Sequence, residues 1–437
     1  MKFRIFGILT VLAALLLSGC TMTTIDQMYC LPKRSEEYNN LQSAMDAAML
    51  ELEYCAPVSG ENQQTVQMAD LDGDGTLEYL LFAKDTAAQP LRILIFRNID
   101  GDYVHIDTIK SNGLEFDQVE YVKMAHSRRT MLIVGKKISD QVIRSLSVYA
   151  YTPQGMEQLV TTNYRKFLPT DLNNDGISEL FVLRSGITEA DNGVAEFYTL
   201  ANGTMERSNE VNMSQPVDKL KRIIIGKLQD NSHAVFAAST VGDSAIITDI
   251  FAVNNDLLTN ITISNDAGTG VQTMRNYYVY ADDIDNDGVV ELPDLLTPAT
   301  TNGSIGKHDL ILWYAMNISG EKVAKMYTYH NFVGGWYLRL DSDWADAVTV
   351  SNVGNRYEFF IREKDTQVSQ RVMTIYVSGS QTREDNNGEN GDIILLKTES
   401  ITYTASLDDA AKQYNITKEF VMDGFYLIHE DWKTGEM

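Results

Sequence analysis

Three short stretches of the chain crowd carboxylates together at one regular spacing. They begin at Asp70 (DLDGDGTLE), Asp171 (DLNNDGISE) and Asp283 (DIDNDGVVE). In each stretch positions 1, 3 and 5 carry side-chain oxygens, position 6 is glycine and position 9 is glutamate. Like charges this close repel one another unless something compensates them, and the usual compensation is a cation. The spacing therefore predicts three cation sites.

Calcium is the ion that fits these ligands. It takes about six to eight hard oxygen ligands, and alternate residues of a tight turn can aim that many inward. Gly75, Gly176 and Gly288 permit the positive φ that swings a chain around an ion, and position 7 would add its backbone carbonyl. The predicted ligands are Asp70, Asp72, Asp74, Thr76 and Glu78 in site 1, Asp171, Asn173, Asp175, Ile177 and Glu179 in site 2, and Asp283, Asp285, Asp287, Val289 and Glu291 in site 3. Because Asn173 replaces a carboxylate, site 2 is predicted to be the weakest of the three.

The flanks of the loops indicate strands rather than the helices of an EF-hand. An EF-hand takes its bidentate glutamate from position 12, where this chain has Leu81, Val182 and Asp294. The flanking residues alternate between apolar and polar, so each loop is expected to join two strands of a hairpin. The alternative for each loop is a solvated Asn/Asp/Gly turn without an ion. Three matching copies favour the ion.

Strand-like runs continue through most of the chain and predict an all-β fold. From about residue 64, runs rich in Val, Ile, Tyr and Phe are broken by Gly, Asn and Asp. Plain copies of the strand, turn, strand pattern alternate with the acidic ones, which gives a repeat of about 50 to 55 residues, the size of a β-propeller blade of four short strands. We therefore predict a β-propeller of about six to seven blades, with calcium-binding hairpin loops in alternate blades and one short N-terminal helix. The alternative is two β-sandwiches joined end to end.

The predicted organisation has five parts. They are a lipoprotein signal peptide (1–19), a tether (20–34), an N-terminal helix and linker (35–63), the propeller-like repeats (64–405) and a C-terminal closing segment (406–437). Within the repeats the predicted blades are 64–112, 113–163, 164–217, 218–270, 271–332 and 333–405. The closing segment is expected to form a short helix and a final strand that pairs with the N-terminal part.

The loops and their flanking strands resemble the FG-GAP and VCBS-type repeats of integrin-like propellers. In those repeats D-x-D-x-D-G-x-x-(D/E) loops bind calcium between the strands of a blade. The chain as a whole, with its acidic repeats and its FYLIHEDW ending, is similar to VCBS-repeat lipoproteins of clostridial-type bacteria. The resemblance implies a calcium-stabilised propeller. It implies no biochemical role.

The first twenty residues have the layout of a secretory signal. Lys2 and Arg4 precede an uncharged run over residues 5–17, which is too short to span a bilayer as a helix. The ending LSGC resembles the bacterial lipobox, which implies cleavage before Cys20 and attachment of lipid to it. The protein is therefore expected outside the cytoplasm, anchored to the cell membrane through Cys20. The alternative is an ordinary secretory signal.

Two further features follow from an exported, acidic chain. Cys30 and Cys55 are permitted to form a disulfide, although two cysteines do not require one. The formal net charge is −24, and loss of Lys2 and Arg4 with the signal makes the mature chain more negative still. Such a surface repels nucleic acid and anionic lipid headgroups and attracts divalent cations. We expect a monomer with no nucleic-acid partner.

Two classes of function fit the sequence. The first is a non-catalytic surface module that binds a protein or glycan ligand, and the second is a cell-envelope glycan hydrolase or lyase on a propeller scaffold. The acidic pair Asp341 and Asp343 has the residue types of a glycosidase, yet such pairs arise by chance in a chain with 60 acids. Trp336, Tyr337 and Trp344 could line a groove or pack in the core, and packing is the favoured interpretation. Without a recognised catalytic motif in the sequence, the binding module is favoured.

Overall fold

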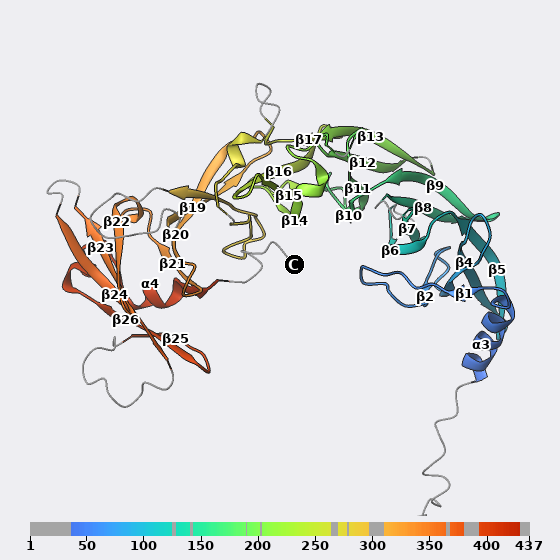
Figure 1. Ribbon diagram of the computed structural model, residues 1–437, viewed down its shortest axis with the longest axis horizontal. Helices are drawn as coiled ribbons and strands as arrows, with labels where there is room; N and C mark the ends of the chain where they lie inside the picture. The colour runs from blue at the N-terminus through green and yellow to red at the C-terminus, as the bar shows by residue number, and fades with distance from the viewer. Residues whose placement is uncertain are drawn as a thin grey trace, which may run out of the picture. The chain divides into compact units, whose positions relative to one another are not determined.

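The described residues form an all-β protein with few helices, as predicted (Figure 1). The computed structural model describes residues 36–124, 128–139, 143–188, 190–201, 203–263, 270–277, 279–296, 310–363, 368–379 and 393–428. The chain divides into two compact units, of which unit 1 takes Met1–Ala56, Gln64–Ala69 and Leu77–Asn112. Unit 2 takes Pro57–Gln63, Asp70–Thr76 and Gly113–Met437.

Unit 1 is one antiparallel sheet with a helix packed on it. Its elements are α3 (Glu36–Ala48), β1 (Glu53–Tyr54), β2 (Val66–Ala69), β3 (Glu78–Lys84), β4 (Leu91–Ile99) and β5 (Asp102–Ser111). The apolar stripe of α3 buries Met45 against Leu81 and Phe96. The helix ends at Ala48 within the segment 35–63 predicted for the helix and linker, and Glu53 begins the strand that pairs with β3.

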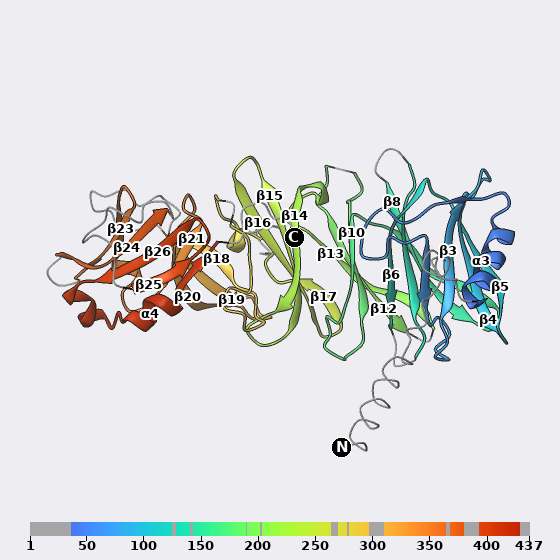
Figure 2. The same cartoon turned by 90° about the horizontal axis from the view of Figure 1, so that it is seen from below.

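Unit 2 holds five antiparallel sheets of four or five strands among its described residues (Figure 2). The first consists of β6 (Glu115–Val122), β7 (Met131–Lys137), β8 (Arg144–Thr152) and β9 (Gly155–Asn163). The second consists of β10 (Lys166–Thr170), β11 (Glu179–Arg184), β12 (Val194–Ala201) and β13 (Thr204–Asn212). The third consists of β14 (Leu220–Lys227), β15 (His233–Val241), β16 (Ala245–Asn254) and β17 (Leu257–Asn260). The last two are β18 (Leu292–Leu296), β19 (Leu310–Met316), β20 (Lys322–Asn331) and β21 (Trp336–Leu340), and β22 (Val348–Val353), β23 (Arg356–Arg362), β24 (Ser369–Gly379), β25 (Ile393–Lys397) and β26 (Ile401–Leu407).

Consecutive sheets of unit 2 share hydrophobic clusters and therefore pack face to face. Phe181 of β11 and Phe251 of β16 lie 5.3 Å apart between ring centroids, in a cluster built from two successive sheets. The next cluster joins Phe236 of β15 to Tyr314 of β19. Inner strands are consequently buried on both faces, and for this reason β11 reads as the continuous apolar run LFVL instead of alternating.

The C-terminal segment contradicts one prediction. It forms the expected short helix, α4 (Lys418–Asp423), and the expected strand, β27 (Phe425–Leu427). That strand pairs with β21 of the fifth sheet, with Leu338 opposite Phe425, and not with the N-terminal part. Because β21 would otherwise leave an open sheet edge, pairing with β27 satisfies its backbone groups, and Phe425 stacks on the fully buried Trp336. The strand β21 itself belongs to the fifth sheet, whereas we had placed it in the last blade, 333–405.

The predicted features of the N-terminus fall mostly outside the described residues. The signal peptide, the tether, Cys20 and Cys30 all lie there. Cys55 is described and half-buried, and its disulfide with Cys30 stays a prediction. Among the described residues, none of the helices is both long and apolar enough for a membrane span.

Replacing the ring shared by two sheets tests their face-to-face packing. Phe251→Ala removes a fully buried aromatic side chain and should lower the free energy of unfolding by about 3 to 5 kcal/mol. Ile187→Ala is the control, because Ile187 is 99% exposed and its loss should change stability by less than about 0.5 kcal/mol. Urea denaturation of both variants measures the difference. Equal stability of the two variants would contradict the shared core.

Candidate metal centre

The three acidic loops occupy the same place in their strand pairings. In loop 1 Ala69, the residue before the first aspartate, pairs with Glu78. In loop 2 Thr170 pairs with Glu179 in the same register. In loop 3 an isolated bridge joins Asp282 to Glu291, so its first flank is a bridge and not the strand that we predicted. The position-9 glutamate is thus held at the base of each loop by backbone pairing.

Two backbone positions in each loop take a left-handed conformation. The position-6 glycines do so as predicted, and position 4 does so as well. The φ values at positions 4 and 6 are 80° and 94° for Gly73 and Gly75, 62° and 84° for Asn174 and Gly176, and 61° and 86° for Asn286 and Gly288. Gly and Asn tolerate this region best, so the residue types at position 4 carried a signal that the sequence analysis missed.

Backbone amides inside each loop bind the aspartates and fix their direction. The amides of Gly176 and Gly288 donate to the first aspartate of their loops at 2.9 and 2.8 Å, and Gly75 does the same at 3.1 Å. The amides of Thr76, Ile177 and Val289 donate to the position-5 carboxylates at 2.6, 2.8 and 2.8 Å. The loop conformation therefore orients the carboxylates before any ion arrives. A carbonyl contribution from Thr76, Ile177 and Val289 stays a prediction.

The structure brings most of the predicted side-chain ligands together. Three groups each place carboxylate oxygens within 4.8 Å of one another, namely Asp70, Asp72 and Glu78, then Asp171, Asp175 and Glu179, and then Asp283, Asp285 and Glu291. Asp74 and Asp287 fall outside these groups, and Asp287 instead contacts Lys325 at 3.3 Å. In loop 2 the amide of Asn173 donates to Asp175 at 3.0 Å.

The position-9 glutamates are buried at the centre of this geometry. Glu78 and Glu291 are fully buried, and Glu179 is 5% exposed. Burial raises the pKa of Glu179 from 4.5 to about 7 and that of Glu291 to about 8, since the charged form loses its hydration. One oxygen of Glu291 accepts from the amide of Ile284 at 3.2 Å, while Oε1 has no hydrogen-bond partner among the described residues. A buried carboxylate oxygen without a hydrogen bond is available to coordinate a cation. The residues present therefore fit a divalent ion with hard oxygen ligands.

Loop 1 has a feature that distinguishes it from the other two. Arg97 of β4 contacts the buried Glu78, with 2.8 Å between Nε and Oε1. The guanidinium already offsets one negative charge there. Sequence reasoning missed this partner because Arg97 lies on the neighbouring strand, and only the strand register brings it close.

Loops 2 and 3 both contact the turn between β14 and β15. Nδ1 of His233 lies 2.5 Å from the carbonyl oxygen of Asp171 in loop 2. On the other side, the amide of Lys227 donates to the carbonyl of Gly288 at 3.2 Å, and the amide of Val290 donates to the carbonyl of Lys227 at 3.0 Å. This plain turn, over residues 227–233, therefore holds the backbone of two acidic loops.

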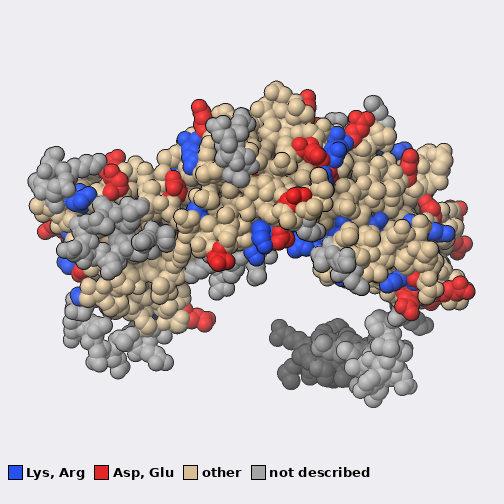
Figure 3. All heavy atoms as spheres, turned by 45° about the horizontal axis from the view of Figure 1, so that its top comes forward, with Lys and Arg blue, Asp and Glu red and all other residues tan. Residues whose placement is uncertain are grey.

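The remaining candidates of the sequence analysis fall in two places. Trp336 and Trp344 are buried in the core of the last two sheets, which confirms packing as their role. Tyr337 is buried too, but it also lines a pocket beside the third acidic loop. Asp341 lines a pocket on the fifth sheet, and its carboxylate accepts from the amide of Asp343 at 2.9 Å. On the face seen in Figure 3, basic and acidic side chains are interspersed.

Comparisons with known proteins find loose structural likenesses. No family model matches the chain, and no curated protein matches it. Similar solved structures include the exotype rhamnogalacturonan lyase YesX, with 14% identity and a TM-score of 0.29 over 74% of this chain and 65% of that one. Others are the rhamnogalacturonan lyase YesW (13%, 0.28, 73% and 74%) and Sqt1 from Chaetomium thermophilum (11%, 0.31, 71% and 70%). At these TM-scores the likenesses assign no activity to this chain.

Adding a carboxylate to loop 2 and removing one from loop 1, in separate variants, should change the calcium affinities of the two sites in opposite directions. Asn173→Asp adds a carboxylate and removes the amide that occupies Asp175, so site 2 should bind roughly tenfold more tightly, or about 1.4 kcal/mol. Asp72→Asn should weaken site 1 by a similar factor. Asp100→Asn is the matched control, since Asp100 is an exposed turn residue with φ of 56°, which Asn tolerates. Calorimetric titration with calcium measures all three variants, and unchanged heats for Asn173→Asp and Asp72→Asn would contradict the predicted sites.

The raised pKa values of Glu179 and Glu291 predict the pH dependence of the chelated protein. Their folded-state pKa values, about 7 and about 8, exceed the ordinary value of 4.5, so between these limits the folded state binds more protons than the unfolded state. Stability in chelator should therefore fall as pH rises from about 4.5 to about 8, and calcium should abolish the fall by replacing the protons. Melting curves with chelator or calcium measure this effect. Equal chelated stability at both ends of the range would contradict it.

Proposed function

We propose that the protein is a lipid-anchored, calcium-stabilised β-propeller outside the cytoplasm, which binds a ligand without catalysis. The observation that carries the calcium assignment is the set of buried position-9 glutamates, above all Glu291, whose Oε1 has no hydrogen-bond partner in the part of the chain that the structure describes. All candidate side-chain ligands are oxygens. Oxygen ligands favour calcium or magnesium over zinc or copper, and calcium accepts an irregular cage of oxygens on a turn, whereas magnesium requires a near-ideal octahedron.

Calcium would contribute a sizeable share of the stability. Extracellular calcium modules bind with dissociation constants of about 10⁻⁴ to 10⁻³ M, so at about 1 mM calcium each site adds roughly 0.4 to 1.4 kcal/mol. Three sites together add roughly 1 to 4 kcal/mol, against a total stability of about 5 to 15 kcal/mol for a typical protein.

The arrangement of the sheets supports the propeller. Within unit 2 the first three sheets run in simple sequence order, as up-and-down blades do. Successive sheets of unit 2 share their cores. Loops 1 and 2 lie in the first and third sheets of the chain and loop 3 ends directly before β18 of the fifth, which is the alternation that the repeats predict. We propose one blade per sheet, and the resemblance to FG-GAP and VCBS repeats supports the same arrangement.

The anchoring is proposed from the lipobox-like ending at Cys20. Metabolic labelling with a lipid probe should tag the wild-type protein. Cys20→Ser should abolish the label and release the protein to the medium, because a single thiol carries the anchor. Cys55→Ser is the control, and this variant should keep both the lipid label and its association with the membrane. A Cys20→Ser protein that stays on the membrane would refute the anchor.

Binding without catalysis is tested by scoring two outcomes in one screen. The purified full chain is incubated with cell-wall glycans, peptidoglycan and surface proteins, and both retention and product release are measured. Retention without product is expected. Release of reducing ends or unsaturated sugars would instead establish the alternative, a glycan hydrolase or lyase. The grouped carboxylates Asp283, Asp285 and Glu291 are assigned to the ion, so no two of them are proposed as a catalytic pair.

A further inference from the structure

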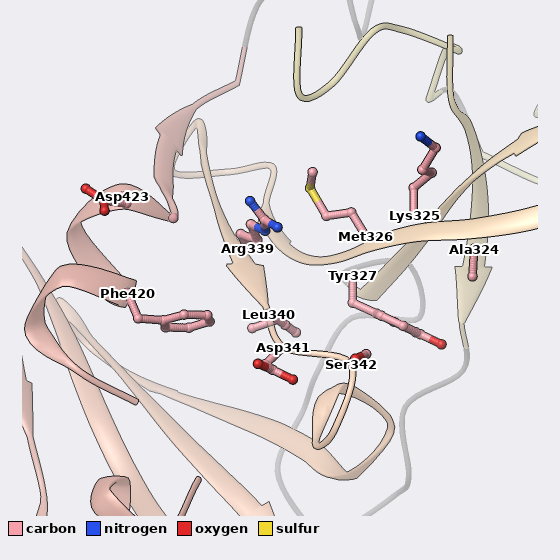
Figure 4. A pocket seen from close by; sticks show the side chains of 11 residues that line it. Ala324, Lys325, Met326, Tyr327, Arg339, Leu340, Asp341, Ser342, Phe420 and Asp423 are labelled. Carbon is pink, nitrogen blue, oxygen red and sulfur yellow. The ribbon is translucent and has the colours of Figure 1, made fainter. Parts of the chain in front are cut away.

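A groove follows the fifth sheet from the third acidic loop to α4. It consists of two pockets, of about 490 and 250 Å³, which share Met326 and Arg339 in their linings. Figure 4 shows side chains from β20, β21 and α4 around the larger pocket, with Phe420 and Asp341 on one side of Arg339. The smaller pocket is lined by Asp283 and other residues of the third acidic loop. We call the two pockets together the Arg339 groove. Its size suits a ligand of several rings.

An aromatic platform lies at the small end of the Arg339 groove. Tyr426 is 46% exposed, and its ring stacks on Tyr337, with 5.2 Å between centroids and 18° between planes. Tyr337 in turn stacks on the fully buried His330 at 5.0 Å and 9°. The hydroxyl of Tyr426 donates to the carbonyl of Asp423 at 2.7 Å, which fixes the ring further. A ring that is already immobile loses little entropy when a flat apolar surface packs on it.

The rest of the lining is apolar below and charged at the rim. Met326 and Leu340 are buried and form an apolar floor. Arg339 and Asp423 are exposed and Asp341 is half-buried, so the rim offers both donors and acceptors. This combination of an apolar floor, a flat aromatic ring and a few polar groups is what a small-ligand site requires.

The mixed signs of the rim decide which ligands fit. A polyanion would meet Asp341, Asp423 and the aspartates of the third loop, and a polycation would meet Arg339 and Lys325. An uncharged ligand with many hydroxyls avoids like-charge repulsion from either set of residues, because each hydroxyl can donate to a carboxylate and accept from a guanidinium. A sugar ring adds an apolar C–H face, which matches the open face of Tyr426. The lining therefore favours a neutral sugar over a charged polymer.

We propose that the Arg339 groove binds a neutral oligosaccharide, with Tyr426 stacking on a sugar ring and Arg339 donating to its hydroxyls. This assignment rests on the proposed binding function and gives that function a site and a ligand class. It places the sugar beside the third acidic loop, since Asp283 and Asp285 line the same groove.

Binding of defined glycans to the full chain tests the proposal. The neutral probes are hexasaccharides of glucan, mannan, xylan and galactan, and the charged probes are polygalacturonate, chitosan and an acidic and a basic peptide. At least one neutral probe should bind more tightly than every charged probe in calorimetry. Tyr426→Ala and Arg339→Ala should each weaken that binding at least about tenfold. Tyr426→Phe should keep most of it, because the ring remains.

Controls separate the site from the fold and from the proposed function. Tyr54→Ala removes a 56% exposed tyrosine in unit 1 and should leave binding unchanged, and melting curves should match wild type for every variant that is compared. Wild-type affinity in both Tyr426→Ala and Arg339→Ala would overturn the assignment of glycan binding to the Arg339 groove, while leaving a glycan-binding function intact. Tightest binding to a charged probe, weakened by the same variants, would overturn the ligand class. No binding to any glycan probe would overturn the proposal, and the surface-protein arm of the earlier screen would then decide the proposed function.

Discussion

The buried carboxylate at the base of each acidic loop is the constraint on which the proposed chemistry of this protein depends. Strand register places the position-9 glutamate opposite the residue that precedes the loop, which puts Glu179 and Glu291 inside the fold. A buried carboxylate is stable only if it is protonated, hydrogen-bonded or paired with positive charge. Glu78 obtains positive charge from Arg97. Glu179 and Glu291 each accept one backbone amide, from Leu172 and Ile284, and the rest of the compensation falls to a proton or a cation. The acidity of the loops follows from this need, since the aspartates around each glutamate would make the cation the better partner.

The same strand register explains why most of the site was predictable. The spacing of Asp, Asn, Gly and Glu fixes which side chains share a turn, and the structure brings carboxylate oxygens from three acidic residues of each loop within 4.8 Å of one another. Local spacing does not contain contacts across strands or between sheets. Arg97, which contacts Glu78, and His233, which contacts the backbone of Asp171, are distant in sequence and are brought close only by the fold.

The fold was predictable to a similar depth. The alternation of apolar runs with Gly and Asn turns predicts short antiparallel strands, and the described residues form such strands throughout. The pairing of β27 with β21 was not predictable, because a three-residue strand has no periodicity to assign its partner. Its place is decided by the open edge of β21 and by the contact of Phe425 with Trp336, which are tertiary in origin.

The plain turn over residues 227–233 connects the two acidic loops beside it, because it contacts both of them. It contacts the backbone of loop 2 through the side chain of His233 and the backbone of loop 3 through the main chain of Lys227. If an ion bound to either loop further restrained this turn, the second ion would have less ordering left to impose. By thermodynamic reciprocity each ion would raise the affinity for the other by the same factor. Loops more than 100 residues apart in the chain would then respond to calcium as one cooperative pair, over a narrower range of concentration than two independent sites.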